Sequence, residues 1–254
     1  METLYRKDGA QWVPTEYTLG PLPGAQHGGA VAGVTVNLLE AHAKEIGAGS
    51  AMMVSICQLR PAPITPATIE VETVRQGRRS AFLRAETYFD GKLTAIANAV
   101  YSHPLPVETL PPFREQRQDP SESEPFSIEG MAPGPHFGHA LEIRVGAEGM
   151  VWMRPTRPVV DEITPVARVC GMADMSPGCS MIATRTDWRN LVAAFPTTDL
   201  TVHLARPPRG EWLGVRAKTQ WYDNGLGMTE SAIFDEAGPL GRIAQSLVAI
   251  PHPA

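Results

Sequence analysis

Asp174 is the side chain best placed for chemistry, because it lies in a strongly apolar part of the chain. Its neighbours favour a helix that is largely shielded from water: Val169, Cys170 and Met172. A carboxylate in such surroundings interacts strongly with a bound water, and it can act as a general base or attack an electrophilic carbon directly. An aspartate in an apolar helix is more often satisfied by a backbone group or an arginine, so this residue alone does not decide its role.

A second candidate is the run His27, Gly28 and Gly29, which opens a long apolar segment. The unpaired N–H groups at a helix N-terminus favour negative charge, and glycines let a ligand approach the backbone closely. Such donors could stabilise an oxyanion that forms during acyl transfer. The plainer interpretation of His27 is a cap or a packing residue at the helix entrance.

The charge balance argues against nucleic acid as a partner. The chain of 254 residues has a net charge of -5, with 22 basic residues that are mostly scattered. Nucleic-acid binding instead draws on clustered Lys and Arg. The short run at Arg206, Arg209, Arg216 and Lys218 is typical of a solvated face, or of a site for a small phosphorylated ligand.

No membrane-spanning segment, signal peptide or cofactor motif is indicated, and we expect a cytoplasmic protein without a cofactor. The three cysteines, Cys57, Cys170 and Cys179, lie in apolar surroundings and are expected to be buried thiols. His136 and His139 are close together in a Pro- and Gly-rich loop, but no further ligand set accompanies them. The expectation is therefore no metal site.

The two halves of the chain follow one plan. Leu59-Arg60-Pro61 precedes an alternating strand and a final apolar run that ends at His103-Pro104. Ala205-Arg206-Pro207 precedes a similar series that ends at His252-Pro253. This repeat predicts a duplicated unit. Residues 105–135 are rich in Pro, Glu, Ser and Gln, so we expect units at 1–104 and 136–254 with a linker between them.

Each half is expected to hold one enclosed helix and an antiparallel meander. The segment 28–46 is apolar on nearly every face and predicts a helix surrounded by other structure. A second helix is expected over about 165–176, since Pro165 and Pro177-Gly178 punctuate its ends. Asp90-Gly91 predicts a hairpin turn. The fold class is α+β, with a sheet curled around each helix and the two sheets paired edge to edge.

In this order and spacing, three stretches resemble the double hotdog acyl-CoA thioesterases: 165–174, 199–212 and 241–247. The resemblance implies two tandem hotdog units, hydrolysis of an acyl-CoA thioester, and no metal or other cofactor. It also implies a homo-oligomer. It does not settle the acyl chain, nor whether CoA or a carrier protein bears it.

Matching the motifs of that family residue by residue implies a catalytic set of Asp174, Thr197 and Gln245, in which either Thr197 or Thr198 could face the site. The resemblance also implies substrate contacts at His27, Gly28 and Gly29. A carboxylate is expected to work as nucleophile or general base, with Gln245 orienting water and Thr197 supplying a further bond.

A comparison of the two copies indicates that the first unit lacks the acid and the glutamine of this set. The interval from His27 to the acid of single hotdog thioesterases arrives at Val36, with Asn37 beside it, and the place that matches Gln245 holds Ile96. We therefore expect one working site per chain, with its polar groups in the second unit.

Two other functions are compatible with the same fold. One is a non-catalytic acyl-thioester binding protein, because a fold does not guarantee a reaction. The other is a hotdog hydratase or dehydratase, which ranks lower because no histidine follows Asp174 on its loop and helix.

Overall fold

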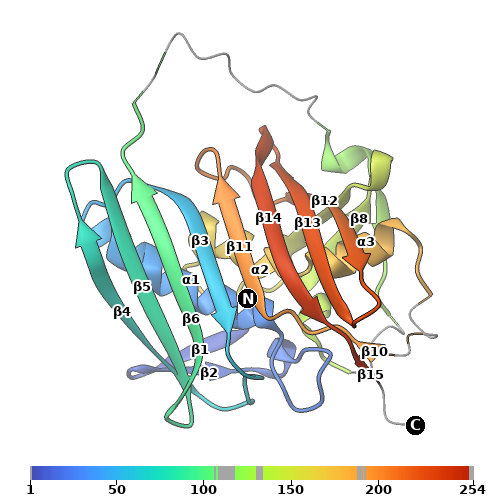
Figure 1. The fold of residues 1–254 in the computed structure, drawn as a ribbon, viewed down its shortest axis with the longest axis horizontal. Helices are drawn as coiled ribbons and strands as arrows, with labels where there is room; N and C mark the ends of the chain where they lie inside the picture. Colours follow the sequence, from blue (N-terminus) through green and yellow to red (C-terminus); the bar gives the residue numbers. More distant parts are fainter. Residues whose placement is uncertain are drawn as a thin grey trace.

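The computed structural model describes residues 2–105, 107, 118–129, 134–187, 191 and 193–251. Its main feature is one antiparallel sheet of 13 strands, with the helices gathered behind it in Figure 1. The strand order is β1-β2-β4-β5-β6-β3-β11-β14-β13-β12-β9-β8-β7. The predicted α+β class is confirmed, and so is the enclosed helix with a meander in each half.

The first half contributes one long helix and six strands of this sheet. The hairpin between its last two strands turns at Asp90 and Gly91, whose φ values of 49° and 70° are those of the predicted tight turn. The elements are β1 (Tyr5–Asp8), β2 (Gln11–Pro14), α1 (Gly28–Glu45), β3 (Ser50–Gln58), β4 (Ala67–Gln76), β5 (Ser80–Phe89) and β6 (Lys92–Ser102).

The second half repeats the helix and meander with additional short strands. A separate two-stranded sheet pairs β10 with β15. The elements are β7 (Glu124–Phe126), β8 (Leu141–Val145), β9 (Val151–Pro155), α2 (Pro165–Ala173), α3 (Ser176–Ala183), β10 (Ala193–Ala194), β11 (Asp199–Leu204), β12 (Leu213–Trp221), β13 (Leu226–Asp235), β14 (Gly238–Val248) and β15 (Ile250–Pro251).

The two halves join where β3 pairs with β11, near the centre of Figure 1. This antiparallel register sets Cys57 opposite Asp199 and Val54 opposite Val202. The predicted edge-to-edge pairing is therefore confirmed. It removes two strand edges that would otherwise expose unpaired backbone groups. It also places the end of β3 beside the segment that precedes β11.

The expected linker at 105–135 holds structure in its described part. Glu124–Phe126 forms β7, which pairs with β8 at the edge of the sheet, and the half-buried Phe126 packs against the main core. The connection is therefore more than an exposed spacer, because its apolar residues Phe126 and Ile128 contribute to the core. The rest of this segment, at 106, 108–117 and 130–133, lies outside the described residues.

The expected helix over 165–176 is interrupted at Asp174. Helix α2 ends at Ala173 and α3 begins at Ser176. Pro177 has no N–H to offer the carbonyl of Ala173, which instead accepts a hydrogen bond from the Ser176 hydroxyl at 2.7 Å. The break places Asp174 at the C-terminal end of α2 rather than inside a continuous helix.

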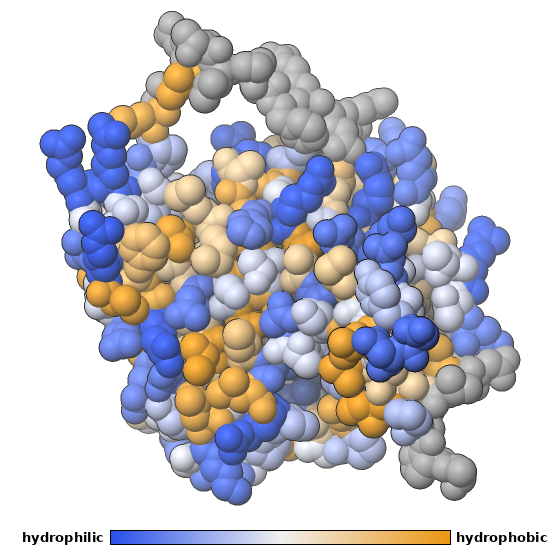
Figure 2. Space-filling model, in the orientation of Figure 1, coloured by the Kyte–Doolittle hydropathy of each residue, from blue (hydrophilic) through white to orange (hydrophobic). Residues whose placement is uncertain are grey.

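The face of the sheet that lies away from the helices carries apolar groups scattered among polar ones (Figure 2). This is the pattern of strands that alternate between a buried and a wet face, as in β5, whose residues alternate along its length. The opposite face packs on the helices and forms a core shared by both halves.

Helices α1 and α2 approach closely because glycines face each other. A Cβ atom on Gly29 would overlap with the backbone carbonyl oxygen of Gly171, and one on Gly33 would lie 2.8 Å from a methyl group of Val159. Backbone cannot move aside as a flexible side chain can. The spacing of the two helices therefore depends on Gly29.

Replacing Gly29 with alanine is expected to lower the free energy of unfolding by about 1–3 kcal/mol, because the added methyl group separates α1 from α2. Gly77→Ala is the matched control, since a Cβ there meets nothing closer than 3.6 Å. Denaturant unfolding of both variants measures the difference. Equal stability of the two would contradict this account of the helix contact.

Candidate active site

Two donors converge on one oxygen of the Asp174 carboxylate. The Thr197 hydroxyl donates to Oδ1 at 2.9 Å, and the Gln245 side-chain amide donates to the same atom at 3.0 Å. Asp174 and Gln245 are buried, with exposed fractions of 6% and 1%. The structure thus brings together the three side chains that the sequence singled out. Thr197 and Gln245 both donate to the carboxylate itself, whereas Gln245 was expected to orient a water.

The strands explain how these groups meet. Gln245 lies in β14, which pairs with β11, and Thr197 forms an isolated bridge to Leu247 just before β11 begins. The choice between the two threonines is resolved by their hydroxyls. Thr198 contacts Asp199 and the Ser246 carbonyl instead, so Thr197 is the one that reaches Asp174.

The other carboxylate oxygen, Oδ2, faces the entrance of α1. It lies 3.1 Å from His27 Nδ1, and a Cβ atom on Gly28 would come within 2.7 Å of it. The first N–H groups of a helix lack intrahelical acceptors and carry partial positive charge. The N-terminus of α1 therefore presents positive partial charge to this carboxylate oxygen.

His27 Nδ1 has two competing partners. It lies 3.0 Å from the N–H of Gly29, which it caps when it carries a lone pair, and 3.1 Å from Asp174 Oδ2. One ring nitrogen offers either a lone pair or a proton. The two contacts are therefore alternatives: Nδ1 either accepts a hydrogen bond from Gly29 N–H or donates one to Asp174 Oδ2.

Aromatic residues that follow the expected linker cover His27. The ring of Phe137 stacks on the imidazole at 4.4 Å, and His136 meets it edge-on at 6.2 Å. Burial and, to a smaller extent, charge repulsion from the neighbouring His27 and His139 together lower the pKa of His136 to about 4. His136 is therefore neutral at physiological pH, and its Nδ1 accepts a hydrogen bond from Gly138 N–H at 3.1 Å.

The three residues of the His-Gly-Gly run have different surroundings. His27 and Gly28 border Asp174, whereas Gly29 is pressed against α2. The carboxylate, hydroxyl and amide come from the second half, as expected, and His27 and Gly28 border the carboxylate from the first half.

The counterpart of Asp174 in the first unit is Asn37 rather than Val36. Asn37 lies ten positions after the cap of α1, as Asp174 lies ten after Thr164, the cap of α2. Its Oδ1 accepts a hydrogen bond from Thr164 N–H at 2.8 Å, while Val36 is fully buried in the core. An amide thus takes the matching position at the entrance of α2.

Two buried amide atoms near Asp174 have no hydrogen-bond partner among the described residues: Gln58 Nε2 and Gln245 Oε1. Gln58 is the last residue of β3, and a Cβ atom on Gly28 would overlap with its Nε2. Sequence reasoning missed Gln58, since a polar residue at a strand end carries no special signal.

Two residues of the basic run have partners within the protein. Arg206 forms a bidentate pair with the buried Asp235 at 2.6 Å for both bonds, and Arg216 lies 3.5 Å from Glu148. Cys57 is exposed, contrary to expectation, because its position in β3 turns it to the outer face; Cys170 and Cys179 are buried. Within the described ranges no cluster of three or more His, Cys, Asp or Glu could hold a metal.

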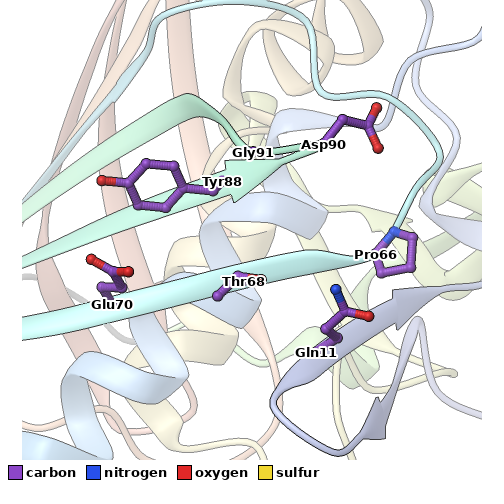
Figure 3. Close-up of a pocket in the computed structure, with 7 residues that line it drawn as sticks. All are labelled: Gln11, Pro66, Thr68, Glu70, Tyr88, Asp90 and Gly91. Carbon is purple, nitrogen blue, oxygen red and sulfur yellow. The ribbon is translucent and has the colours of Figure 1, made fainter.

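A hollow of about 340 Å³ lies elsewhere, in the first half. Figure 3 shows it where β2 meets β4 and the hairpin that follows β5. These strands are separated from β11 and β14 by β6 and β3, so the hollow is distinct from the site at Asp174. Its lining residues are Gln11, Pro66, Thr68, Glu70, Tyr88, Asp90 and Gly91.

None of the helices in the described part of the chain has both the length and the apolar character needed to span a bilayer.

Family models match nearly the whole chain. The model of the acyl-CoA thioesterase N-terminal domain matches residues 19–102, and that of the C-terminal domain matches residues 106–249. A search of the curated proteins finds no match.

Solved structures share the fold at low sequence identity. A hotdog-fold protein of unknown function from Alicyclobacillus acidocaldarius is 18% identical with a TM-score of 0.71, and the match covers 98% of this chain and 96% of that one. Acyl-CoA thioesterase II TesB2 from Mycobacterium marinum is 17% identical with a TM-score of 0.68, over 98% and 96%. A tesB protein of Mycobacterium avium subspecies paratuberculosis is 20% identical with a TM-score of 0.66, over 97% and 96%. The predicted double hotdog fold is confirmed.

His136 is expected to make the protein less stable in acid. Its pKa falls from an ordinary 6.5 to about 4 on folding, so the unfolded chain takes up a proton in that interval while the folded chain does not. Stability that is present above pH 6.5 is lost as the pH falls toward about 4.

The variant His136→Asn keeps an acceptor for Gly138 N–H and removes this titration. Its free energy of unfolding should therefore fall less steeply over the same interval when denaturant unfolding is measured at several pH values. Identical slopes for the two proteins would refute the assignment.

Proposed function

The chain belongs to the acyl-CoA thioesterase family, and from this premise we propose that it hydrolyses a fatty or similar acyl-CoA to the free acid and CoA through a water activated by Asp174. Its family makes it a thioester hydrolase. The convergence of Thr197 and Gln245 on Asp174 Oδ1 is the observation that carries the proposal.

The two carboxylate oxygens have separate tasks in this mechanism. Oδ1 is held by Thr197 and Gln245, which fixes the orientation of the carboxylate. Oδ2 accepts a proton from the attacking water, and the buried Gln245 Oε1 atom, which has no hydrogen-bond partner among the residues the structure describes, can accept that water's second hydrogen. In this proposal the carboxylate acts through the water as a general base and does not attack the thioester itself.

The reaction follows from this arrangement. Water adds to the thioester carbon as its proton passes to Oδ2, and an oxyanion forms near the N-terminus of α1, where positive partial charge stabilises it. The oxyanion collapses, the carbon–sulfur bond breaks, and the proton returns to the CoA sulfur. His27, which lies beside Oδ2, can relay that proton.

Asp174→Asn is expected to lower kcat for acyl-CoA hydrolysis by about 10²–10⁴-fold, because the amide cannot accept the proton of the water. Asp223→Asn, in an exposed turn, makes the same change of charge without touching the site and should leave kcat unchanged. A thiol-detecting assay over a series of saturated acyl-CoAs measures both. If the wild-type protein binds acyl-CoA but turns it over no faster than Asp174→Asn, it is a binding protein.

The contact between His27 and Asp174 favours hydration of enoyl thioesters as a second candidate. Sequence reasoning ranked this reaction low because no histidine follows Asp174, but the first half supplies one at 3.1 Å. A carboxyl group and an imidazole at such a distance can protonate one carbon of a double bond and deliver water to the other.

If this second reaction occurs, wild-type protein mixed with a 2-enoyl-CoA should yield the 3-hydroxyacyl-CoA, detected by mass spectrometry, and His27→Gln should abolish that product. The melting temperature of the same variant is the control for folding, and His103→Gln, directly after β6 on the exposed surface, is the matched substitution away from the site. Recovery of only free acid and unchanged enoyl-CoA would eliminate the hydratase.

The resemblance also implies a homo-oligomer, which we retain as a proposal, and analytical ultracentrifugation of the purified protein measures it.

A further inference from the structure

Gln58 brings a polar group of the first half into the space beside Asp174. Its Nε2 atom is buried and has no hydrogen-bond partner in the described part of the chain. A Cβ atom on Gly28 would overlap with this nitrogen and lie 2.7 Å from Asp174 Oδ2. The amide and the carboxylate oxygen therefore both lie against the backbone of Gly28, at the first turn of α1.

The joint between the two halves fixes Gln58 in this place. Its backbone N–H donates to the Thr198 carbonyl at 2.9 Å, directly after the pairing of Cys57 with Asp199. Thr197, the next residue back from Thr198, holds Asp174 Oδ1. The backbone pairing that unites the sheets thus sets the Gln58 side chain and the Thr197 hydroxyl on two sides of one carboxylate.

The orientation of the Gln58 amide follows from its surroundings. An amide oxygen turned toward the carboxylate would face the negative Oδ2, whereas the NH₂ group presents hydrogens to it. A buried donor without an acceptor costs free energy of folding. Such an atom is suited to an acceptor that is present only when substrate is bound.

We propose that Gln58 Nε2 donates a hydrogen bond to the carbonyl oxygen of the thioester and to the oxyanion that it becomes. The inference rests on the proposed hydrolase function. A water on Asp174 Oδ2 reaches the carbonyl carbon, while the carbonyl oxygen points to Gln58 Nε2 and the Gly28 N–H. Negative charge that develops on this oxygen meets two preorganised donors in a site shielded from water.

The chain offers a matched pair of variants for the test. Gln58 ends β3 and Gln76 ends β4, where Gln76 donates to the Ile46 carbonyl on the exposed surface. Methionine has the length of glutamine and no donor. Gln58→Met should lower kcat by about 10²–10³-fold, the usual effect of losing one oxyanion donor, with little change in KM. Gln76→Met should leave both constants unchanged.

Stability separates this role from a structural one. Because Gln58→Met removes a buried donor that has no partner, its melting temperature should stay equal to that of the wild type or rise. A residue kept for folding would lower it. Gln58→Ala, which is smaller, should show the same loss of kcat. An unchanged kcat in either folded variant overturns the proposal.

A direct readout uses octanoyl-CoA labelled with ¹³C at its carbonyl. Bound to the Asp174→Asn protein, its carbonyl stretch should shift to lower frequency, because hydrogen bonds polarise the C=O group. In the Asp174→Asn, Gln58→Met double variant the band should return toward its frequency in water-free solvent. An equal shift in both proteins shows that Gln58 does not touch the carbonyl.

The outcomes distinguish this proposal from the proposed function. Absence of acyl-CoA hydrolysis by the wild type, together with a Gln58-dependent band shift, rejects the hydrolase and keeps the contact. Hydrolysis that depends on Asp174 but not on Gln58 keeps the hydrolase and rejects the contact. Failure of octanoyl-CoA to bind, together with no hydrolysis of any saturated acyl-CoA, rejects both.

Discussion

The structure depends on placing one buried carboxylate against the entrance of a helix from the other half of the chain. A charged group out of water must be paired or hydrogen-bonded, or it destabilises the fold. Asp174 meets this requirement through Thr197, Gln245 and His27, which come from three separate segments. The close approach of α1 and α2 at Gly29 and the pairing of β3 with β11 bring those segments together.

The same architecture explains why the two halves differ. The N-terminus of each helix receives a side chain from the other helix. Asp174, at the end of α2, reaches the N-terminus of α1, and Asn37, in the middle of α1, reaches the N-terminus of α2. Asn37 is neutral and its oxygen satisfies the N–H of Thr164, so this entrance is closed by a structural hydrogen bond. The carboxylate at the other entrance presents Oδ2 to His27 and to the first turn of α1. In the proposed mechanism this oxygen accepts the proton of water, so one functional group distinguishes the proposed reactive entrance from the structural one.

The sequence revealed the duplicated fold and three of the polar residues, for identifiable reasons. Strand alternation, the turn at Asp90-Gly91 and the Pro-punctuated second helix are local signals, and the structure confirms the elements they predict. The break at Asp174 was missed because Pro177 was read as following the helix, whereas it acts on the carbonyl of Ala173. The contact of His27 with Asp174 and the position of Gln58 depend on residues far apart in sequence, so no local pattern could disclose them. Counting along the sequence matched Asp174 to Val36, with Asn37 beside it. Only the hydrogen bond between Asn37 and Thr164, which the sequence does not reveal, identifies Asn37 as the counterpart.

The seam between β3 and β11 has a consequence for inheritance. Since the residues around Asp174 are drawn from both sides of it, exchanging either half of the gene by recombination changes the partners of this carboxylate. A chimaera of two such proteins must therefore match His27 and Gln58 to residues more than a hundred positions downstream.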